Sequence, residues 1–329
     1  MIEASIIADS ISPQGKRIVT YKLRYPKFIH GEFMTHRVIS RNASSSRAIP
    51  TSKLIEEVRS DALRAGPVFW GKNQSGMQAA EELSAEPVQG QTAWMKLDID
   101  HPHFGSLSMS EKDRARALWS EAAGQAAHYA EFMHKVGVHK QIVNRLLEPF
   151  SHINVVATAT EWDNFFGLRL HKDAQPEMLA LASAMWEARK ASTPRLLKPE
   201  EWHLPFVDSF NNILDYAQVS AQSTPLTEFA IKVSVARCAR VSYESFETGK
   251  RSTVEEDLKL YDRLVGAQPL HASPAEHQAT PDNPYMGGEA GSKWQRPGEH
   301  GNFVGWRQYR KMLPGEAVAP LPEGYQPWL

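Results

Sequence analysis

The sequence from Thr20 to Arg47, TYKLRYPKFIHGEFMTHRVISRNASSSR, changes character twice. Residues 17–25 are rich in β-branched and aromatic side chains and predict a strand, which Pro26 ends. Residues 27–38 predict a helix, and residues 40–47 are small and polar, which predicts a loop. A strand that leads through a helix into such a loop favours an α/β fold.

The rest of the chain alternates apolar segments with long polar stretches. Residues 2–8 predict a second strand, joined to the first by a turn at residues 12–15. Residues 153–159 fit either a buried strand or an apolar helix, because periodicity does not decide between them. Helices are predicted over residues 54–63, 111–136, 140–147, 161–170, 176–191, 254–264 and 302–313. We infer a single α/β domain over residues 1–329, with long loop insertions at 66–110 and 194–224.

Charge and cysteine content exclude several classes of protein. The chain has 329 residues, with 37 Lys plus Arg against 38 Asp plus Glu. This balance argues against a nucleic-acid partner, which needs a basic surplus, although it leaves room for a local arginine cluster. Cys238 is the only cysteine, so the chain has neither an intramolecular disulfide nor a cysteine zinc site. With no apolar run of ~18 residues and no secretory signal at residues 1–10, we expect a cytoplasmic protein without a membrane partner.

Residues 36–47 gather side chains that bind anions. Three guanidinium groups, one imidazole, one amide and four hydroxyls fall within this segment. Arginine forks match phosphate oxygens, and serine hydroxyls with loop N–H groups complete a phosphate cradle. A solvated serine-rich loop is the alternative, and composition alone does not separate the two interpretations.

The order of these residues resembles the signature segment of the flavin-dependent thymidylate synthases (ThyX). In that family a strand, a proline and a helix ending in Arg-His-Arg precede a loop of the form Ser-x-Asn-x-x-Ser-x-Arg. Here the helix ends in Thr35-His36-Arg37, and the loop supplies Ser40, Asn42, Ser45 and Arg47 without a gap. The resemblance implies a ThyX-like fold, a central mixed β-sheet flanked by helices.

Two further blocks resemble the same family. Residues 143–149, VNRLLEP, are similar to a family helix that offers an arginine to the nucleotide. Residues 164–169, NFFGLR, with Ala174-Gln175 and Glu177, are similar to the family block Asn-Phe-x-x-Leu-Arg…Ala-Gln-x-Glu. Several identities in the family's own order support the resemblance.

A third block stands at a different place in the chain. The family begins with an Ala-Arg-x-Ser stretch and a helix that leads to His-x-x-Pro-x-Glu-His, and residues 236–243 and 271–277 match these two ends. The resemblance therefore implies a circular permutation, which compact domains tolerate when their termini lie close together. The expected parts are 18–195 with the signature loop and the nucleotide and flavin helices, 228–280 with the family's N-terminal part, and a C-terminal extension, 281–329. We predict that His277 lies near the strand at residues 17–25.

The resemblance also implies an activity. Members of the family bind FAD and convert dUMP to dTMP, with methylenetetrahydrofolate as the carbon donor and NADPH as the reductant, and they assemble as homotetramers. This chemistry needs no cysteine nucleophile, which suits a chain whose only thiol, Cys238, falls within an apolar helix pattern. We expect the same cofactor, the same co-substrates and an oligomer here.

The matched positions imply a role for each site residue. The residues expected to contact the flavin are His36, Arg37, Asn42, Asn164, His271, Glu276 and His277. The residues expected to bind the nucleotide are Glu32, Ser45, Ser46, Arg47, Arg145 and Arg169. Arg169 is also the expected catalytic residue, because a guanidinium at the pyrimidine ring stabilises the negative charge that builds on the ring oxygen. Ser45 has no base beside it in the sequence and is interpreted as a phosphate ligand.

Several residues depart from the family pattern. Thr35 stands where an Arg is usual, Glu32 where a Gln is usual, and Ala43 where a Glu is common. Thr158 and Thr160 replace an Asn and an Arg that usually meet the cofactor. The first three changes leave the pyrimidine open, so a hydroxymethylase or methyltransferase acting on another nucleotide, such as dCMP, is an alternative. A catalytically idle nucleotide-binding protein on the same fold is a third possibility.

Two other features remain outside these blocks. Residues 306–310, WRQYR, carry the arginine and glutamine character that residues 31–35 lack. We hypothesise that this segment folds over the site and restores phosphate contacts. His101 and His103 could suggest a metal, but two histidines without a partner motif are a weak signal, and we expect no metal site.

Overall fold

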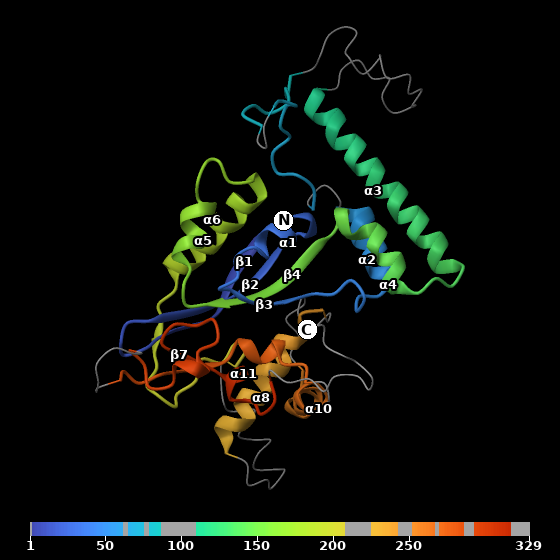
Figure 1. Cartoon of the computed structure of the whole chain (residues 1–329). Coiled ribbons are helices and arrows are strands. Elements are labelled where there is room, and N and C mark those ends of the chain that lie inside the picture. The colour runs from blue at the N-terminus through green and yellow to red at the C-terminus, as the bar shows by residue number, and fades with distance from the viewer. Residues whose placement is uncertain are drawn as a thin grey trace, which may run out of the picture.

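A mixed β-sheet forms the centre of the molecule (Figure 1). The computed structural model describes residues 2–61, 65–75, 79–86, 110–207, 225–242, 252–266, 270–285 and 293–316. The five strands lie in the order β3-β4-β2-β1-β5. They are β1 (Glu3–Ile11), β2 (Arg17–Pro26), β3 (Ser40–Ala43), β4 (His152–Ala159) and β5 (Arg195–Leu196). All neighbours pair antiparallel except β1 and β5, which are parallel, so the predicted mixed sheet is confirmed.

One face of the sheet, called here the apolar face, packs against helices. Its side chains from β2 are Val19, Tyr21, Leu23 and Tyr25, all fully buried. They form one core with α5 (Asp163–Arg169) and α6 (Pro176–Ala191), which lie on the same side of the sheet in Figure 1. Burial of this apolar surface, at roughly 25 cal/mol per Å², holds the helices to the sheet.

The opposite face, called here the polar face, carries Thr20 of β2 and Thr158 of β4 in directly paired positions. The C-terminal third of the chain covers this part of the face, as the orange and red elements in Figure 1 show. These elements are α8 (Leu226–Ala239), η4 (Arg240–Ser242), α10 (Val254–Val265), η5 (Ser273–Glu276), β6 (Ala279–Pro281), η6 (Pro297–Glu299), β7 (Trp306–Gln308) and α11 (Tyr309–Met312). β6 and β7 pair antiparallel as a separate two-stranded sheet.

A third cluster of helices lies beside the sheet. It contains α2 (Thr51–Asp61), α3 (Glu111–Lys135), α4 (Lys140–Val143) and the 3-10 segment η3 (Asn144–Phe150). α3 begins where the Ser110 hydroxyl accepts a hydrogen bond from the Asp113 amide, and it ends before Gly137, whose φ is +89°. The predicted helix at residues 111–136 is confirmed. Within the described ranges, no helix combines the length and the hydrophobicity needed to cross a membrane.

The predicted helix over residues 27–38 is wrong in its second half. The segment forms a 3-10 turn, η1 (Lys27–Ile29), and a short helix, α1 (His30–Phe33). Arg41 Nη1 donates to the carbonyl oxygens of Phe33, Met34 and His36 at 3.3, 3.3 and 2.9 Å. These carbonyl groups are thereby satisfied from outside the helix, so the helix ends early.

Two other predictions are corrected by strand pairing. The first half of the predicted loop at residues 40–47 is the edge strand β3, which pairs with β4 through backbone groups. The predicted closing helix at residues 302–313 begins with β7, and only α11 is helical. Residues 153–159, which fitted a strand or a helix, belong to β4, whose eight side chains are all buried, and this explains the missing alternation.

Candidate functional site

Two of the sequence motifs meet where α1 lies against the end of α5. Arg169, the last residue of α5, donates from Nε to His36 Nε2 at 2.9 Å. Its Nη1 forms an ion pair with Glu32 Oε1. His36 and Arg169 are 133 residues apart in the chain. The fold therefore joins the signature segment and the second block in one cluster, called here the Arg169 cluster (Glu32, His36 and Arg169).

His36 is held in one orientation within this cluster. Its ring packs edge-on against Phe165, with centroids 4.9 Å apart and an interplanar angle of 77°. Because Arg169 Nε is a donor, His36 Nε2 must accept, which assigns the ring proton to Nδ1. Burial, followed by the positive charges of Arg169 and Arg41, lowers the pKa of His36 below its ordinary value. His36 is therefore a neutral imidazole near neutral pH.

Two other predicted flavin residues lie next to the Arg169 cluster and are exposed. Arg37 follows His36 directly, and Asn164 is in the first turn of α5, the helix that ends in Arg169. Their exposed side chains are accessible to a ligand that approaches the cluster from solvent. The fold thus brings His36 and Arg169 into contact, with Arg37 next to His36 in the sequence and Asn164 on the helix that ends in Arg169.

The predicted phosphate loop is fixed against η3. Ser46 Oγ donates to Glu148 Oε1 at 2.6 Å, and Lys27 Nζ forms an ion pair with the same oxygen at 2.6 Å. Asn144 Nδ2 donates to the Ser46 carbonyl oxygen at 2.7 Å. Burial alone would raise the pKa of Glu148, but the bonds from Lys27 and Ser46 hold it below its ordinary value. A carboxylate therefore stands beside the predicted phosphate ligand Ser46.

Glu148 was not predicted as a site residue, although it belongs to the block at residues 143–149 that carries Arg145. The other residues of the predicted phosphate site are half-buried Ser45 and exposed Arg47 and Arg145. Arg145 Nε donates to the Gln141 carbonyl oxygen at 3.2 Å, and its charge contributes to lowering the pKa of Glu148. The loop and the arginine helix are brought together as predicted, while their binding role stays a prediction.

The remaining predicted flavin residues lie on the side covered by the C-terminal third. Asn42 is 8% exposed and its Nδ2 donates to the Cys238 carbonyl oxygen at 3.3 Å. Glu276 forms an ion pair with Arg310, and His277 is fully buried, with Nδ1 hydrogen-bonded to Thr158 Oγ1 at 2.8 Å. His271, by contrast, is exposed. These four residues do not contact the Arg169 cluster through any hydrogen bond in the described part of the chain.

A family model supplies the decisive comparison. The model described as "Thymidylate synthase complementing protein" matches residues 12–195. This chain belongs to that family. The match spans β2, β3 and β4 together with α1, α5 and α6, and so includes α1 and α5, which carry Glu32 and Arg169 of the Arg169 cluster. The chain is therefore an enzyme of the ThyX family, as its motifs indicated. Among curated proteins, none matches the chain.

Solved structures give more distant similarities. One is the flavin-dependent thymidylate synthase ThyX from Helicobacter pylori complexed with FAD and dUMP, at 17% identity and a TM-score of 0.30. That match covers 52% of this chain and 67% of the other. Another is the UMP/dUMP methylase PolB from Streptomyces cacaoi bound with 5-Br UMP, at 15% identity and a TM-score of 0.36, covering 57% of this chain and 88% of the other.

The residues of this ThyX-family chain fit a flavin only in part. His36 is bonded to Arg169, and exposed Arg37 and Asn164 offer hydrogen-bonding groups of the kind that a flavin ring and its phosphates need. Asn42 points to the polar face, where α8 covers it, and His277 has no exposed surface. A ligand could reach those two side chains only if the covering segments moved.

The predicted nearness of His277 to the strand at residues 17–25 is confirmed. His277 is bonded to Thr158 of β4, whose cross-strand partner on β2 is Thr20. The helix preceding this block, α10, begins with a capping box between Thr253 and Glu256 and matches the predicted helix at 254–264. The circular permutation and the division into residues 18–195, 228–280 and 281–329 stay predictions.

The segment at residues 306–310 lies against the start of β3, and its folding over the site stays a hypothesis. Gln308 Nε2 donates to Ser40 Oγ at 3.3 Å, and the neighbouring Asn302 Nδ2 donates to the Val38 carbonyl oxygen at 2.9 Å. Its two arginines are engaged with carboxylates: Arg307 with Glu299 and Glu200, and Arg310 with Glu276 and Glu316. Phosphate contacts by this segment stay a prediction, because those ion pairs would have to open first.

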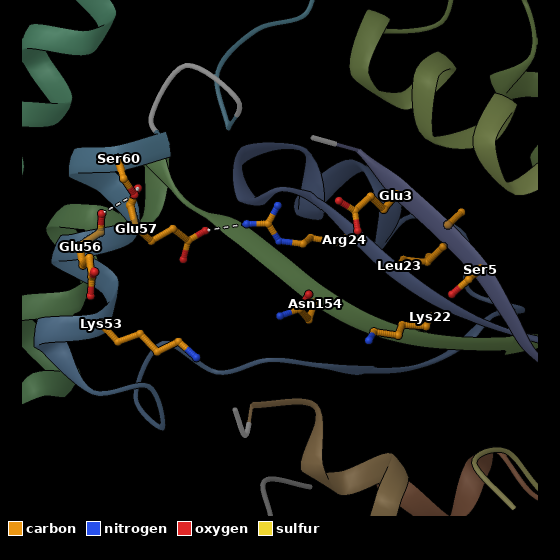
Figure 2. A pocket seen from close by; sticks show the side chains of 11 residues that line it. Glu3, Ser5, Lys22, Leu23, Arg24, Lys53, Glu56, Glu57, Ser60 and Asn154 are labelled. Atoms are coloured by element: carbon orange, nitrogen blue, oxygen red, sulfur yellow. Dashed lines mark hydrogen bonds and ion pairs between the residues drawn. The ribbon is translucent and has the colours of Figure 1, made fainter. Parts of the chain in front are cut away.

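A separate pocket of about 690 Å³ lies on the uncovered half of the polar face (Figure 2). Lys22, Arg24 and Asn154 line it from the sheet, and Lys53 and Glu57 line it from α2. None of the predicted site residues lines this pocket. Arg24 forms an ion pair with Glu57 Oε1 at 3.3 Å, and His152 Nδ1, outside the pocket, lies 3.2 Å from the same oxygen. We therefore place the candidate site at the Arg169 cluster.

No metal site was expected, and the described residues contain no group of three or more His, Cys, Asp or Glu side chains that could hold a metal ion. His101 and His103 lie outside the described residues. Cys238 is buried and free, and burial raises the pKa of its thiol far above the ordinary value. A thiol in that environment is a poor nucleophile.

Proposed function

We propose that this chain catalyses the flavin-dependent methylation of dUMP to dTMP, with methylenetetrahydrofolate as the carbon donor and NADPH as the reductant. Membership of the ThyX family supports the reaction class. The observation that carries the proposal is the Arg169 cluster, in which a guanidinium from the second block is held by Glu32 and His36 of the signature segment. Such a preorganised cation is what a pyrimidine that becomes negatively charged requires.

The residues of the chain have separate tasks under this proposal. FAD, when bound, would supply the hydride that reduces the transferred carbon unit, and His36, Arg37 and Asn164 would hold it. Arg169 would stabilise negative charge on the pyrimidine ring oxygen, while Glu32 keeps its guanidinium in place. Arg47 and Arg145, both exposed beside the fixed loop, would bind the nucleotide phosphate together with Ser45, and Ser46 would join them once its bond to Glu148 opens.

Product analysis tests the proposal. Purified protein supplied with FAD, dUMP, isotopically labelled methylenetetrahydrofolate and NADPH is expected to yield labelled dTMP, detected by mass spectrometry. Arg169→Ala should lower the turnover by about 100-fold, because the loss of one preorganised donor costs roughly 3 kcal/mol in the transition state. Arg263→Ala, which removes an exposed arginine of α10, is the matched control and should leave turnover unchanged. Protein that binds no flavin and forms no product contradicts the proposal.

A different pyrimidine is the second candidate, and Glu32 is the observation that favours it. Glu32 stands where the family usually has Gln, and its carboxylate lies beside Arg169. A carboxylate only accepts hydrogen bonds, whereas an amide both donates and accepts, so Glu32 facing the 4-position of the ring would favour the amino group of cytosine over the carbonyl oxygen of uracil. Competition between dUMP and dCMP distinguishes the candidates, and Glu32→Gln should shift the preference toward dUMP if the carboxylate sets it.

A homotetramer is part of the proposal. Three apolar side chains next to the Arg169 cluster are largely exposed: Met34 (45%), Val38 (45%) and Leu168 (54%). Exposed apolar groups around a binding site are typical of surfaces that a partner covers, here further copies of the chain. Analytical ultracentrifugation is expected to show four copies, and Val38→Glu should weaken that assembly. A stable monomer at micromolar concentration contradicts this part of the proposal and leaves the activity assay decisive for the rest.

A further inference from the structure

Five side chains form an unbroken hydrogen-bond chain across the polar face. Ser10 Oγ lies 2.9 Å from His203 Nδ1, and His203 Nε2 lies 2.8 Å from Thr20 Oγ1. Thr20 Oγ1 is 2.7 Å from Thr158 Oγ1, which is 2.8 Å from His277 Nδ1. This series of hydrogen bonds crosses β1, β2 and β4. It ends at His277 Nε2, a buried atom without a hydrogen-bond partner among the described residues.

All five groups are shielded from water. Ser10 is 4% exposed, His203 1%, and the other three are fully buried. Burial lowers the pKa values of His203 and His277 to about 3. Both imidazoles are therefore neutral near neutral pH, and each carries one ring proton, on Nδ1 or on Nε2.

One backbone unit fixes the positions of both rings. The amide of His203 donates to the carbonyl oxygen of Ala279 at 2.8 Å, and the amide of Ala279 donates back to the His203 carbonyl oxygen at 3.4 Å. Ala279, the first residue of β6, lies two positions after His277. These two backbone hydrogen bonds join the segment that carries His203 to the segment that carries His277, and both rings contact the Thr20–Thr158 pair. A shift of one ring would therefore disturb the other.

Proton counting links the two rings. If His203 Nε2 donates to Thr20, the Thr20 hydroxyl must donate to Thr158, and Thr158 must donate to His277 Nδ1. The His277 proton is then on Nε2. In the reverse direction His277 Nδ1 donates to Thr158, Thr158 donates to Thr20, and Thr20 donates to His203 Nε2. The His203 proton is then on Nδ1, from which it donates to Ser10. In either direction both histidines carry the proton on the same ring nitrogen.

Mixed arrangements are disfavoured. Two rings that both donate inward leave one threonine proton without an acceptor, and two rings that both accept leave no proton between Thr20 and Thr158. An unsatisfied buried group of this kind costs about 1–3 kcal/mol. The unpaired His277 Nε2 decides between the two remaining directions, because a buried unpaired N–H group is less tolerated than a buried unpaired acceptor.

We propose that the five side chains form one directed relay that runs from His277 Nδ1 to Ser10 and leaves His277 Nε2 as an acceptor for one N–H or O–H donor. Thr158, Thr20 and His203 are then positioning residues that fix the tautomer of His277. A water molecule or a ligand group that donates to Nε2 keeps this direction. A group that accepts a hydrogen bond from Nε2 reverses the direction of all four hydrogen bonds. The tautomer of His277 is therefore coupled to the hydrogen bond between His203 and Ser10.

Solid-state ¹⁵N NMR of the full-length protein labelled at the histidine rings tests the relay. The spectra distinguish protonated from bare ring nitrogens, and His203→Asn and His277→Asn assign the two signals. Both histidines are expected to be protonated at Nδ1 and bare at Nε2. Protons on different nitrogens in the two rings overturn the relay. Protons on Nε2 in both rings overturn its direction and the acceptor at Nε2.

A matched pair of variants tests the coupling. Thr158→Val removes the hydroxyl at nearly constant volume and should give His277 a mixture of tautomers, because Nδ1 loses its partner. Ser40→Ala is the control, because Ser40 is paired with Thr158 on β3 and is buried but stands outside the relay. It should leave both rings protonated at Nδ1. An unchanged single tautomer of His277 in Thr158→Val overturns the proposal, as does a changed tautomer in Ser40→Ala.

Discussion

The two faces of the sheet are stabilised in different ways. On the apolar face, β2 and β4 pack against α5 and α6 through a cluster that includes Tyr21, Trp162 and Phe165. On the polar face, the same strands present Thr20 and Thr158 to two buried histidines. Apolar packing is non-directional and scales with the area removed from water, whereas a buried hydrogen-bond chain depends on every member. Substitutions on the two faces should therefore act differently, through lost packing on the apolar face and through unsatisfied polar groups on the polar face.

Phe165→Ala should produce the largest effect on the apolar face. Phe165 is 1% exposed and contacts Phe33, Trp162 and Phe166 as well as His36. Removing a buried phenylalanine side chain costs about 3–5 kcal/mol, and here it also frees the ring of His36. Urea denaturation measures the unfolding free energy. Phe132→Ala, at a 53% exposed position of α3, should cost less than about 1 kcal/mol. Equal losses in the two variants would contradict the assigned role of the apolar face.

Mild acid should weaken the polar face. The pKa values of His203 and His277 are about 3 in the folded chain, below the ordinary 6.5 that applies after unfolding. The unfolded state therefore binds more protons between these values, so stability is constant above pH 6.5 and falls as the pH drops below it. The loss between pH 6.5 and 5.5 should be about 1 kcal/mol for each histidine.

Denaturation at several pH values measures this slope. His30, whose pKa is lowered to about 4 by burial, adds to the same trend from the apolar face. Carboxyl groups such as Glu57 and Glu148, with lowered pKa values, change stability mainly below pH 4.5 and leave this window to the histidines. His203→Gln should remove about 1 kcal/mol of the loss between pH 6.5 and 5.5. A variant with the full wild-type slope would refute that assignment.

Thr158→Val should lower the unfolding free energy by about 1.5 kcal/mol. The change keeps the volume but leaves Thr20 and His277 without a shared partner, and a lost buried hydrogen bond with an unsatisfied group costs roughly 1–3 kcal/mol. Thermal and urea denaturation measure the loss. Thr158→Ser keeps the hydroxyl and should recover most of the hydrogen-bond contribution. If the serine variant were the less stable of the two, methyl packing and not hydrogen bonding would dominate at this position.

Asn302→Ala should have the smallest effect, about 1 kcal/mol. Asn302 joins the covering segment to the signature segment, with bonds to the Val38 carbonyl oxygen at 2.9 Å and to Ser40 Oγ at 3.0 Å. Side-chain hydrogen bonds of this kind contribute about 0.5–1.5 kcal/mol. The measurement is again the unfolding free energy, with Asn283→Ala at an exposed site as the neutral comparison. A loss above 3 kcal/mol would show that Asn302 organises more than this contact.

The apolar face was predictable from the sequence, and most of the polar face was not. The alternation in residues 17–25, the Ala-rich run of α3 and the pattern of α6 each carry local signals. β3 carries none, because three of its four residues, Ser40, Arg41 and Asn42, are polar, and the segment becomes a strand only by pairing with β4. Arg41, which ends the helix after Phe33, acts from that same strand and has no signal within the helix itself.

Some residues of the candidate site could likewise be predicted from the sequence, and others could not. Family motifs led to His36, Arg37, Asn164 and Arg169, which the fold brings together. Glu148 and the relay residues Ser10 and His203 could not be predicted, because their roles depend on partners far away in the chain. Ser10 and His203 are 193 residues apart, and no spacing rule connects residues at such a separation.

The order of strands has a consequence for how the chain is made. The apolar face can close once α6 has left the ribosome, because β1, β2, β3, β4 and both covering helices precede residue 192. The polar face has to wait for β7, about 150 residues after the end of β4. At ~5–20 residues per second, Thr20 and Thr158 spend roughly 8 to 30 seconds facing water on the nascent chain. Hydroxyl groups suit that interval, because they remain soluble until the covering segment is complete.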